Sequence, residues 1–306
     1  MAKRSSSWRR AALLAGLSGL ATASLGGCVG ILDPAGPVGE GDARILIDAL
    51  LIMLAVAVPT IALGFWTAWR YRASNTKAEY LPRWAYSGRI EAISWAIPIL
   101  VIMFLGGVIW IGSHRLDPFR PLPSSQRTLE VQVVSLDWKW LFIYPEQGIA
   151  TVNQLVIPAG RPVRFEVTSD SVFNVFFIPR LGSMIYAMPG MISQVNLQAD
   201  RPVVLDGQSS HFSGDGFSGM RFIVRSVPPA DFAAWAQGAR GAGPQLDRAA
   251  FAALARPSQN TPPAIYGGVD PTLFQAIATQ AIPPGPGPTA AVSSPTGRQL
   301  ATGGRP

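Results

Sequence analysis

The sequence predicts a two-helix transmembrane hairpin, followed by an all-β outer domain and a short helical C-terminal extension. Two apolar runs, 45–69 and 92–112, are each long enough for a membrane helix. From residue 128 the pattern changes to short alternating segments, which are typical of strands. Only 14% of the 306 residues are charged and the mean hydropathy is +0.26, which excludes a disordered polyelectrolyte.

The basic residues are concentrated in two short stretches. The chain carries a net charge of +7, of which the acid-free N-terminal head holds Lys3, Arg4, Arg9 and Arg10. Residues 70–89 carry a further net charge of +4. No broad basic surface remains, so nucleic acid is not an expected partner. One cysteine excludes an intrachain disulfide, and two histidines leave few ligands for a transition metal.

Residues 1–27 have the order of a bacterial lipoprotein signal peptide. The basic head precedes the apolar run Ala11–Ala23, whose 13 residues are too few to span a membrane. Leu25-Gly26-Gly27-Cys28 resembles a lipobox, so we expect lipidation of Cys28 and a periplasmic segment over 28–44. The alternative is an ordinary signal peptide with an incidental thiol.

The two spans predict a single topology. The span over 45–69 contains Asp48 and, we expect, a kink at Pro59, whereas the span over 92–112 contains no charge. The basic loop over 70–91 is expected to be cytoplasmic by the positive-inside rule. The N-terminal segment and the chain after Arg115 then lie in the periplasm.

Glu91 stands where the cytoplasmic loop meets the second span. A carboxylate at the end of a membrane helix is most commonly just solvated, and in that case Glu91 would have no function in the protein. The alternative is a group that collects protons at the mouth of a path through the membrane.

The periplasmic domain is expected over residues 113–227, as an antiparallel sandwich or a Greek-key barrel of short strands. Turns are expected at Pro145, Pro158-Ala159-Gly160, Pro179, Pro189-Gly190 and Asp206-Gly207. Trp138, Trp140, Phe142 and Tyr144 are spaced by two, so they would share one strand face, most simply as a core stripe.

An extension over 228–282 follows, with short helices predicted at 230–237, 247–255 and 271–281. Residues 283–306 are rich in Pro, Gly, Ser and Thr, which predicts a disordered tail.

Several motifs in one order resemble subunit II of the heme-copper terminal oxidases. They are Ile90–Pro98, Thr168–Gly182, Met188-Pro189-Gly190 and Asp206-Gly207-Gln208. The resemblance covers about residues 28–282. It implies that the outer domain is a cupredoxin-like Greek-key fold.

Departures from the family pattern concern its dinuclear copper centre. Cytochrome c oxidase members hold that centre with histidines, two bridging cysteines, a glutamate and a methionine. The corresponding positions here are Asn174, Ser209, His211, Ser213, Phe217 and Met220. A serine hydroxyl cannot replace a bridging thiolate, so the resemblance implies that this subunit holds no metal.

Absence of that centre is the pattern of the quinol-oxidising, cytochrome bo-type branch. Residues Asn174–Met188 and Gly214–Met220 resemble this branch, as does the aromatic segment with Phe232, Trp235, Phe251 and Phe274. The resemblance implies a proton-pumping ubiquinol oxidase of a bacterial inner membrane, which oxidises ubiquinol and reduces dioxygen to water. Heme and copper would lie in subunit I.

This chain would then bind no cofactor and would act in assembly, with subunits I, III and IV as partners and no soluble cytochrome c. Glu91 would lie at the entrance of the proton path. Two alternatives are a membrane-tethered cupredoxin-like scaffold or binding lipoprotein without an oxidase partner, and a cytochrome c oxidase subunit with an unconventional copper site.

Overall fold

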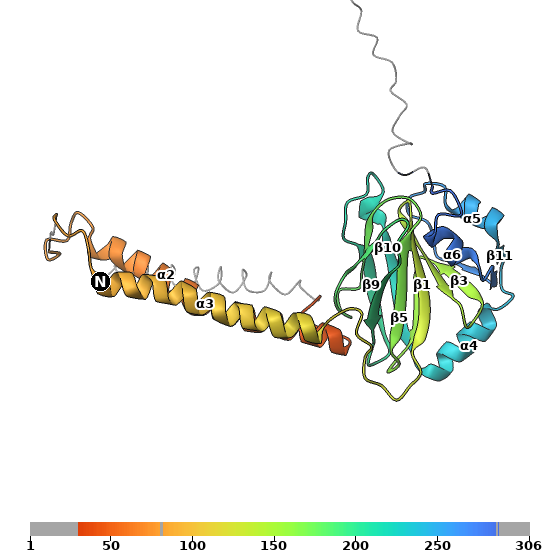
Figure 1. The fold of residues 1–306 in the computed structure, drawn as a ribbon, viewed down its shortest axis with the longest axis horizontal. Coiled ribbons are helices and arrows are strands. Elements are labelled where there is room, and N and C mark those ends of the chain that lie inside the picture. The colour runs from red at the N-terminus through yellow and green to blue at the C-terminus, as the bar shows by residue number, and fades with distance from the viewer. Residues whose placement is uncertain (1–29, 80–81, 286, 288–306) are drawn as a thin grey trace, which may run out of the picture. The chain divides into compact units, whose positions relative to one another are not determined.

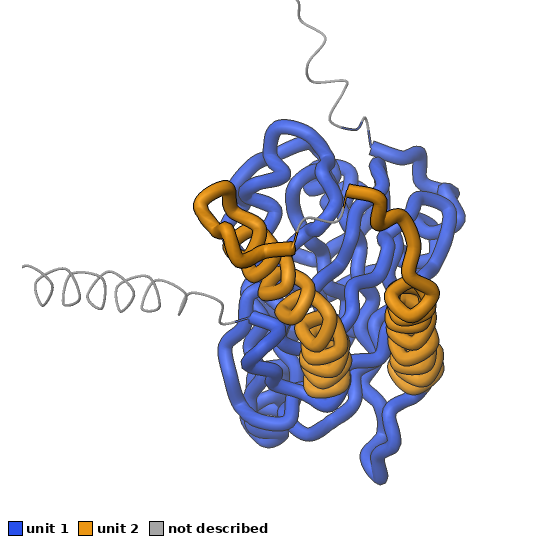
Figure 2. Tube along the Cα trace, turned by 90° about the vertical axis from the view of Figure 1, so that its left-hand side faces the viewer, with its two compact units in different colours: residues 1–39, 121–306 blue, residues 40–120 orange. Residues whose placement is uncertain are grey.

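The computed structural model describes residues 30–79, 82–285 and 287, and the chain forms two compact units. One unit consists of residues 40–120, and the other of residues 1–39 and 121–306 (Figure 2). The predicted signal peptide, Cys28 and residues 288–306 of the predicted tail lie outside the described residues.

The unit of residues 40–120 is built from two long helices, α2 (Pro37–Arg70) and α3 (Gly88–Arg115). Both are long and apolar enough to cross a membrane, and none of the apolar window of either helix is buried. A core helix of a soluble protein would be mostly buried, whereas these helices expose apolar side chains all round. Each predicted span therefore lies within a helix that extends beyond it at both ends.

The outer domain is a sandwich of two sheets (Figure 1). One sheet has six strands in the order β12-β3-β2-β1-β5-β8, and the other has five in the order β4-β10-β9-β6-β7. Most neighbours are antiparallel, but β1 pairs with β5 and β4 with β10 in parallel. The strands are β1 (Leu129–Leu136), β2 (Lys139–Tyr144), β3 (Ile149–Val152), β4 (Gln154–Pro158), β5 (Val163–Ser169), β6 (Asn174–Phe177), β7 (Ile185–Ala187), β8 (Ser193–Leu197), β9 (Val203–Ser209), β10 (Arg221–Val227) and β12 (Ala264–Tyr266).

Most of the C-terminal extension folds onto the six-stranded sheet, whereas its first helix packs against β4 and Tyr144. It contains α4 (Pro229–Ala239), α5 (Arg248–Leu254) and α6 (Leu273–Ala278), and the short strands β11 (Gln245–Leu246) and β13 (Gly268–Val269). Phe251, Leu273 and Phe274 form one buried cluster with Leu141 and Ile143 of β2. The domain therefore has three layers, two sheets and a layer of helices, as Figure 1 shows.

Burial on both faces explains the near-continuous apolar sequence of β2. Leu141 and Ile143 face the helices, whereas Trp140 and Phe142 contact Phe222 of the five-stranded sheet, with ring centroids 5.7 and 5.1 Å away. All six residues of β2 are buried. Such a strand loses the apolar-polar alternation that marks a sheet with one solvated face.

Two sequence predictions need correction, and two short strands of the outer domain were missed. Trp138 does not share the strand face of Trp140, because it lies in the two-residue turn between β1 and β2 with a φ of 62°. Asp206-Gly207 is not a turn but the middle of β9. The strands β3 and β7 were not predicted, and they are only four and three residues long. The core stripe of Trp140, Phe142 and Tyr144 is confirmed, since all three are fully buried.

Gly207 is required by the aromatic packing between the sheets. It lies opposite Phe222 in the β9–β10 register, and a Cβ there would lie 2.1 Å from two carbons of the Phe222 ring. Phe222 in turn stacks on Phe176, with centroids 5.4 Å apart. The ring occupies the space that any other residue at 207 would fill.

We therefore predict that Gly207→Ala destabilises the outer domain by about 1–3 kcal/mol, because Phe222 must move within a packed core. The control is Gly238→Ala in α4, where a Cβ would meet nothing within 4 Å. That change should stabilise the outer domain by about 0.5–1 kcal/mol, because alanine has a higher helix propensity than glycine. Thermal unfolding of the full chain, followed by near-ultraviolet circular dichroism, measures both. Equal melting temperatures for the two variants would contradict the role assigned to Gly207.

Candidate functional site

Three of the six positions that correspond to copper ligands meet where β6, β9 and β10 come together. The Ser209 hydroxyl donates a hydrogen bond to the Asn174 Oδ1 atom at 3.1 Å. The Ser209 backbone N–H donates to the Met220 carbonyl at 3.2 Å. All three residues are buried. The structure therefore brings these three positions together.

The other three positions lie in the loop between β9 and β10. Ser213 is buried, and its carbonyl accepts a hydrogen bond from the Trp138 indole N–H at 3.0 Å. His211 is exposed, with its ring 4.9 Å from that of Phe173. Phe217 packs against Phe212, with ring centroids 5.6 Å apart. Side-chain packing and backbone hydrogen bonds thus hold this loop.

The donor atoms at these positions do not fit a dinuclear copper centre. Two coppers require bridging thiolates, whereas Ser209 and Ser213 offer neutral hydroxyls. The Asn174 amide oxygen already accepts the Ser209 hydroxyl, and His211 is exposed rather than buried beside Met220. Within the described residues, no group of three or more His, Cys, Asp and Glu side chains could hold a metal ion.

The turn between β1 and β2 closes over this loop. A Cβ at Gly216 would lie 2.4 Å from the indole of Trp138, so only glycine permits this contact. Trp138 has a φ of 62°, in a region that a bulky side chain adopts at a cost of roughly 1–2 kcal/mol. The buried indole hydrogen bond to Ser213 offsets that cost.

A buried charged cluster, which was not predicted from the sequence, lies beside the same turn. Asp137, Lys139 and Asp170 are each at most 4% exposed. The Lys139 amino group donates to the Arg256 carbonyl and to the Ser258 hydroxyl, both at 2.7 Å. These bonds tie the extension to β2. The charges of Asp137 and Lys139 at the junction of two apolar strands were the signal that could have revealed it.

Burial is the main cause of the pKa shifts of Lys139 and Asp170. It lowers the pKa of Lys139, and the negative charges of Asp137 and Asp170 partly offset this. Burial likewise raises the pKa of Asp170 to about 6, against the hydrogen bond that its carboxylate accepts from the Gly285 N–H at 3.1 Å. Asp137 accepts a hydrogen bond from the Ser171 hydroxyl at 2.5 Å. All contacts named here join parts of the outer domain, which gives the cluster a structural role.

Glu91 occupies the first turn of α3 and is exposed. Its backbone N–H donates to the Ser87 carbonyl at 3.0 Å, which places it at the start of the helix. Its carboxylate is therefore accessible at the end of an apolar span, a position that suits both interpretations of this residue. Cys28, the predicted lipidation site, is outside the described residues.

Comparison with known proteins gives consistent results along the chain. Residues 129–227 match the family model described as cytochrome c oxidase subunit II, periplasmic domain, and residues 240–285 match the COX aromatic rich motif. The chain is 48% identical to cytochrome bo(3) ubiquinol oxidase subunit 2 of Pseudomonas aeruginosa, over 84% of this chain and 78% of that protein.

Two further relatives agree. Ubiquinol oxidase subunit 2 of Acetobacter aceti is 48% identical over 88% of this chain and 89% of its own length. Cytochrome bo(3) ubiquinol oxidase subunit 2 of Buchnera aphidicola subsp. Schizaphis graminum is 43% identical over 84% of this chain and 90% of its own. The similarity thus extends well beyond the outer domain.

The raised pKa of Asp170 predicts a pH dependence of stability. Because the folded state binds this proton more tightly than the unfolded state, Asp170 contributes most below about pH 4. Its contribution then falls as the pH rises to about 6. We expect the melting temperature of Asp170→Asn, relative to wild type, to increase over this interval and then to level off. The exposed Asp215→Asn is the control. A difference that does not vary between pH 4 and 8 would contradict the assignment.

Proposed function

Because the chain belongs to the ubiquinol oxidase subunit II family of the heme-copper oxidases, we propose that it supplies no redox centre to its complex. The complex is an oxidoreductase that oxidises ubiquinol, and membership in this family implies heme and copper in other subunits. The observation that carries the proposal is the donor set at the copper positions, where Ser209 bonds to Asn174 and Ser213 replaces a thiolate.

Without that centre, the outer domain has no group that could accept an electron from a soluble cytochrome c. Electrons enter instead from ubiquinol in the membrane, and the other subunits reduce dioxygen to water and pump protons. The roles left to this chain are assembly with subunits I, III and IV, and cover for the outer face of subunit I. The scaffold without an oxidase partner has no specific observation in its favour.

We further propose an inner-membrane location with both α2 and α3 spanning the bilayer. The +4 loop of residues 70–89 lies on the cytoplasmic side, so the outer domain lies in the periplasm. Cys28 carries the lipid anchor of the processed N-terminus. Glu91, accessible at the cytoplasmic start of α3, is the entrance of a proton path in subunit I.

The complex purified with this chain should oxidise ubiquinol and should not oxidise reduced cytochrome c. Metal analysis should find only the copper that the other subunits bind. Electron paramagnetic resonance should show no mixed-valence dinuclear signal. Such a signal, or turnover with cytochrome c, would contradict the proposal. Oxidation of neither donor by an intact, heme-containing complex would contradict the function itself.

For Glu91→Gln we predict dioxygen reduction slowed several-fold, with normal heme content and normal assembly. The amide keeps the size and hydrogen bonding of the side chain but cannot accept a proton. Glu91→Asp should retain most activity. Glu79→Gln, an exposed change in the loop that precedes α3, should leave turnover unaltered. Wild-type turnover of Glu91→Gln from pH 6 to 9 would restore the interpretation of Glu91 as a solvated helix end.

Cys28→Ser should abolish lipid modification while the protein stays in the membrane. Two spans of about 20 apolar residues bury far more surface than acyl chains add. Mass spectrometry of the N-terminal peptide and membrane fractionation test the two parts separately. Recovery of the variant in the soluble fraction would refute the two-span topology, and an unmodified wild-type Cys28 would refute the lipidation.

A further inference from the structure

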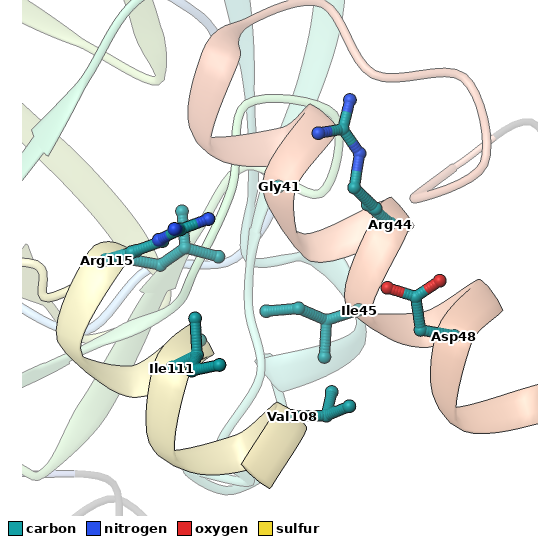
Figure 3. Close-up of a pocket in the computed structure, with 9 residues that line it drawn as sticks. Gly41, Arg44, Ile45, Asp48, Val108, Ile111 and Arg115 are labelled. Carbon is teal, nitrogen blue, oxygen red and sulfur yellow. The ribbon is translucent and has the colours of Figure 1, made fainter. Parts of the chain in front are cut away.

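A pocket lies between α2 and α3 at the end opposite to the 71–87 loop. It is a cavity of about 280 Å³ within the unit of residues 40–120. Its lining, shown in Figure 3, consists of Gly41, Arg44, Ile45, Asp48, Val108, Ile111, Gly112, Arg115 and Leu116. The roles described for the cupredoxin-like domain, Cys28 and Glu91 do not use these residues.

Glycines make the close approach of the helices at this point possible. A Cβ at Gly112 would lie 2.6 Å from the Ile45 side chain, and one at Gly41 would lie 2.7 Å from the Leu116 side chain. The helices therefore form a narrow apolar floor there. Because both glycine contacts lie within the same unit, the shape of the pocket is a property of this hairpin.

Charged groups surround this floor at the level where the apolar spans end. Arg44 immediately precedes the apolar run that starts at Ile45, and Arg115 follows the run that ends at Gly112. One guanidinium thus comes from each helix, and Figure 3 shows Arg115 extending from α3 toward α2. Asp48 lies one helical turn further into the span. The lining carries a net charge of +1.

We propose that this pocket binds the head group of one anionic phospholipid, phosphatidylglycerol, from the outer leaflet. Two guanidinium groups from facing helices suit a phosphodiester anion, which accepts hydrogen bonds from both. The head-group hydroxyls of this lipid donate to Asp48. Ile45, Val108 and Ile111 contact the first acyl carbons.

Size and access agree with this ligand. The cavity is slightly smaller than the roughly 300–1,000 Å³ of pockets for drug-sized molecules, so it takes a head group and leaves most of the acyl chains in the bilayer. A pocket between two lipid-exposed helices is reached by lateral diffusion within the membrane. Zwitterionic phosphatidylcholine lacks both the net negative charge and the hydroxyl donors.

The test uses the detergent-washed complex that contains the full-length chain, titrated with phosphatidylglycerol and followed by native mass spectrometry. Arg44→Gln/Arg115→Gln should weaken retention of one phosphatidylglycerol about a hundredfold, since each of the two guanidinium–phosphate bonds contributes on the order of tenfold in affinity. Arg70→Gln/Arg72→Gln is the matched control, because it removes the same charge at the opposite end of α2.

Asp48→Asn gives an independent prediction of opposite sign. The amide oxygen of the variant still accepts a hydrogen bond from the head-group hydroxyls, whereas the repulsion between the carboxylate and the phosphate is lost, so phosphatidylglycerol should be retained more tightly than in wild type. Phosphatidylcholine with the same acyl chains should show no change in any variant. Equal retention of phosphatidylglycerol by wild type and the double arginine variant would overturn the proposal, as would equal retention of phosphatidylcholine and phosphatidylglycerol by wild type.

Discussion

The outer domain depends on the buried turn between β1 and β2. Together with the first residue of β2, this turn contacts three separate parts of the domain. Asp137 accepts a hydrogen bond from Ser171 after β5, Trp138 donates to Ser213 in the β9–β10 loop, and Lys139 donates to the extension at Ser258. The turn also sets the β1–β2 register, which pairs Leu136 with Lys139. A shift of one residue would exchange the two faces of β2. Because both faces are buried, every side chain of the strand would then be misplaced.

This arrangement explains how the domain orders the loop in which other residues occupy the copper-ligand positions. A dinuclear centre would cross-link β6, β9 and the following loop, and hydrogen bonds make the same connections here. Ser209 joins Asn174 through its hydroxyl and Met220 through its backbone. Within the loop, the Phe217 N–H donates to the Gly214 carbonyl at 3.1 Å, and the Met220 N–H to the Phe217 carbonyl at 3.0 Å. A neutral hydrogen bond contributes only about 1 kcal/mol net, but several of them around a buried indole are enough to order a short loop.

The sequence predicted the parts of the fold whose pattern is local. The spans follow from length and composition, and the stripe Trp140, Phe142, Tyr144 follows from its period of two. The failures have non-local causes. Asp206-Gly207 has the sequence of a turn. Gly207 is needed instead because a side chain there would collide with the ring of Phe222 on the neighbouring strand. Burial of Lys139 depends on carbonyl and hydroxyl groups more than 100 residues away, so the charges at the junction of two apolar strands mark the position but do not predict its partners. For the site, the departures from the ligand pattern were visible in sequence, whereas the contacts that replace those ligands were not.

The membrane helices are stabilised in a different way. Their polar side chains are mostly satisfied within their own helix, since the hydroxyls of Thr60, Thr67 and Ser94 donate to the carbonyls four residues earlier, at 2.8, 2.7 and 2.7 Å. Those groups offer few hydrogen bonds to a neighbouring subunit. Asp48 is the one charged residue in the sequence of the two apolar runs. Association of these helices with partner subunits must therefore come chiefly from van der Waals packing of apolar surfaces, in which lipid competes equally well. A lipid bound by charged residues where the hairpin meets water would fix the orientation of the two helices. Apolar packing alone favours that orientation only weakly over others.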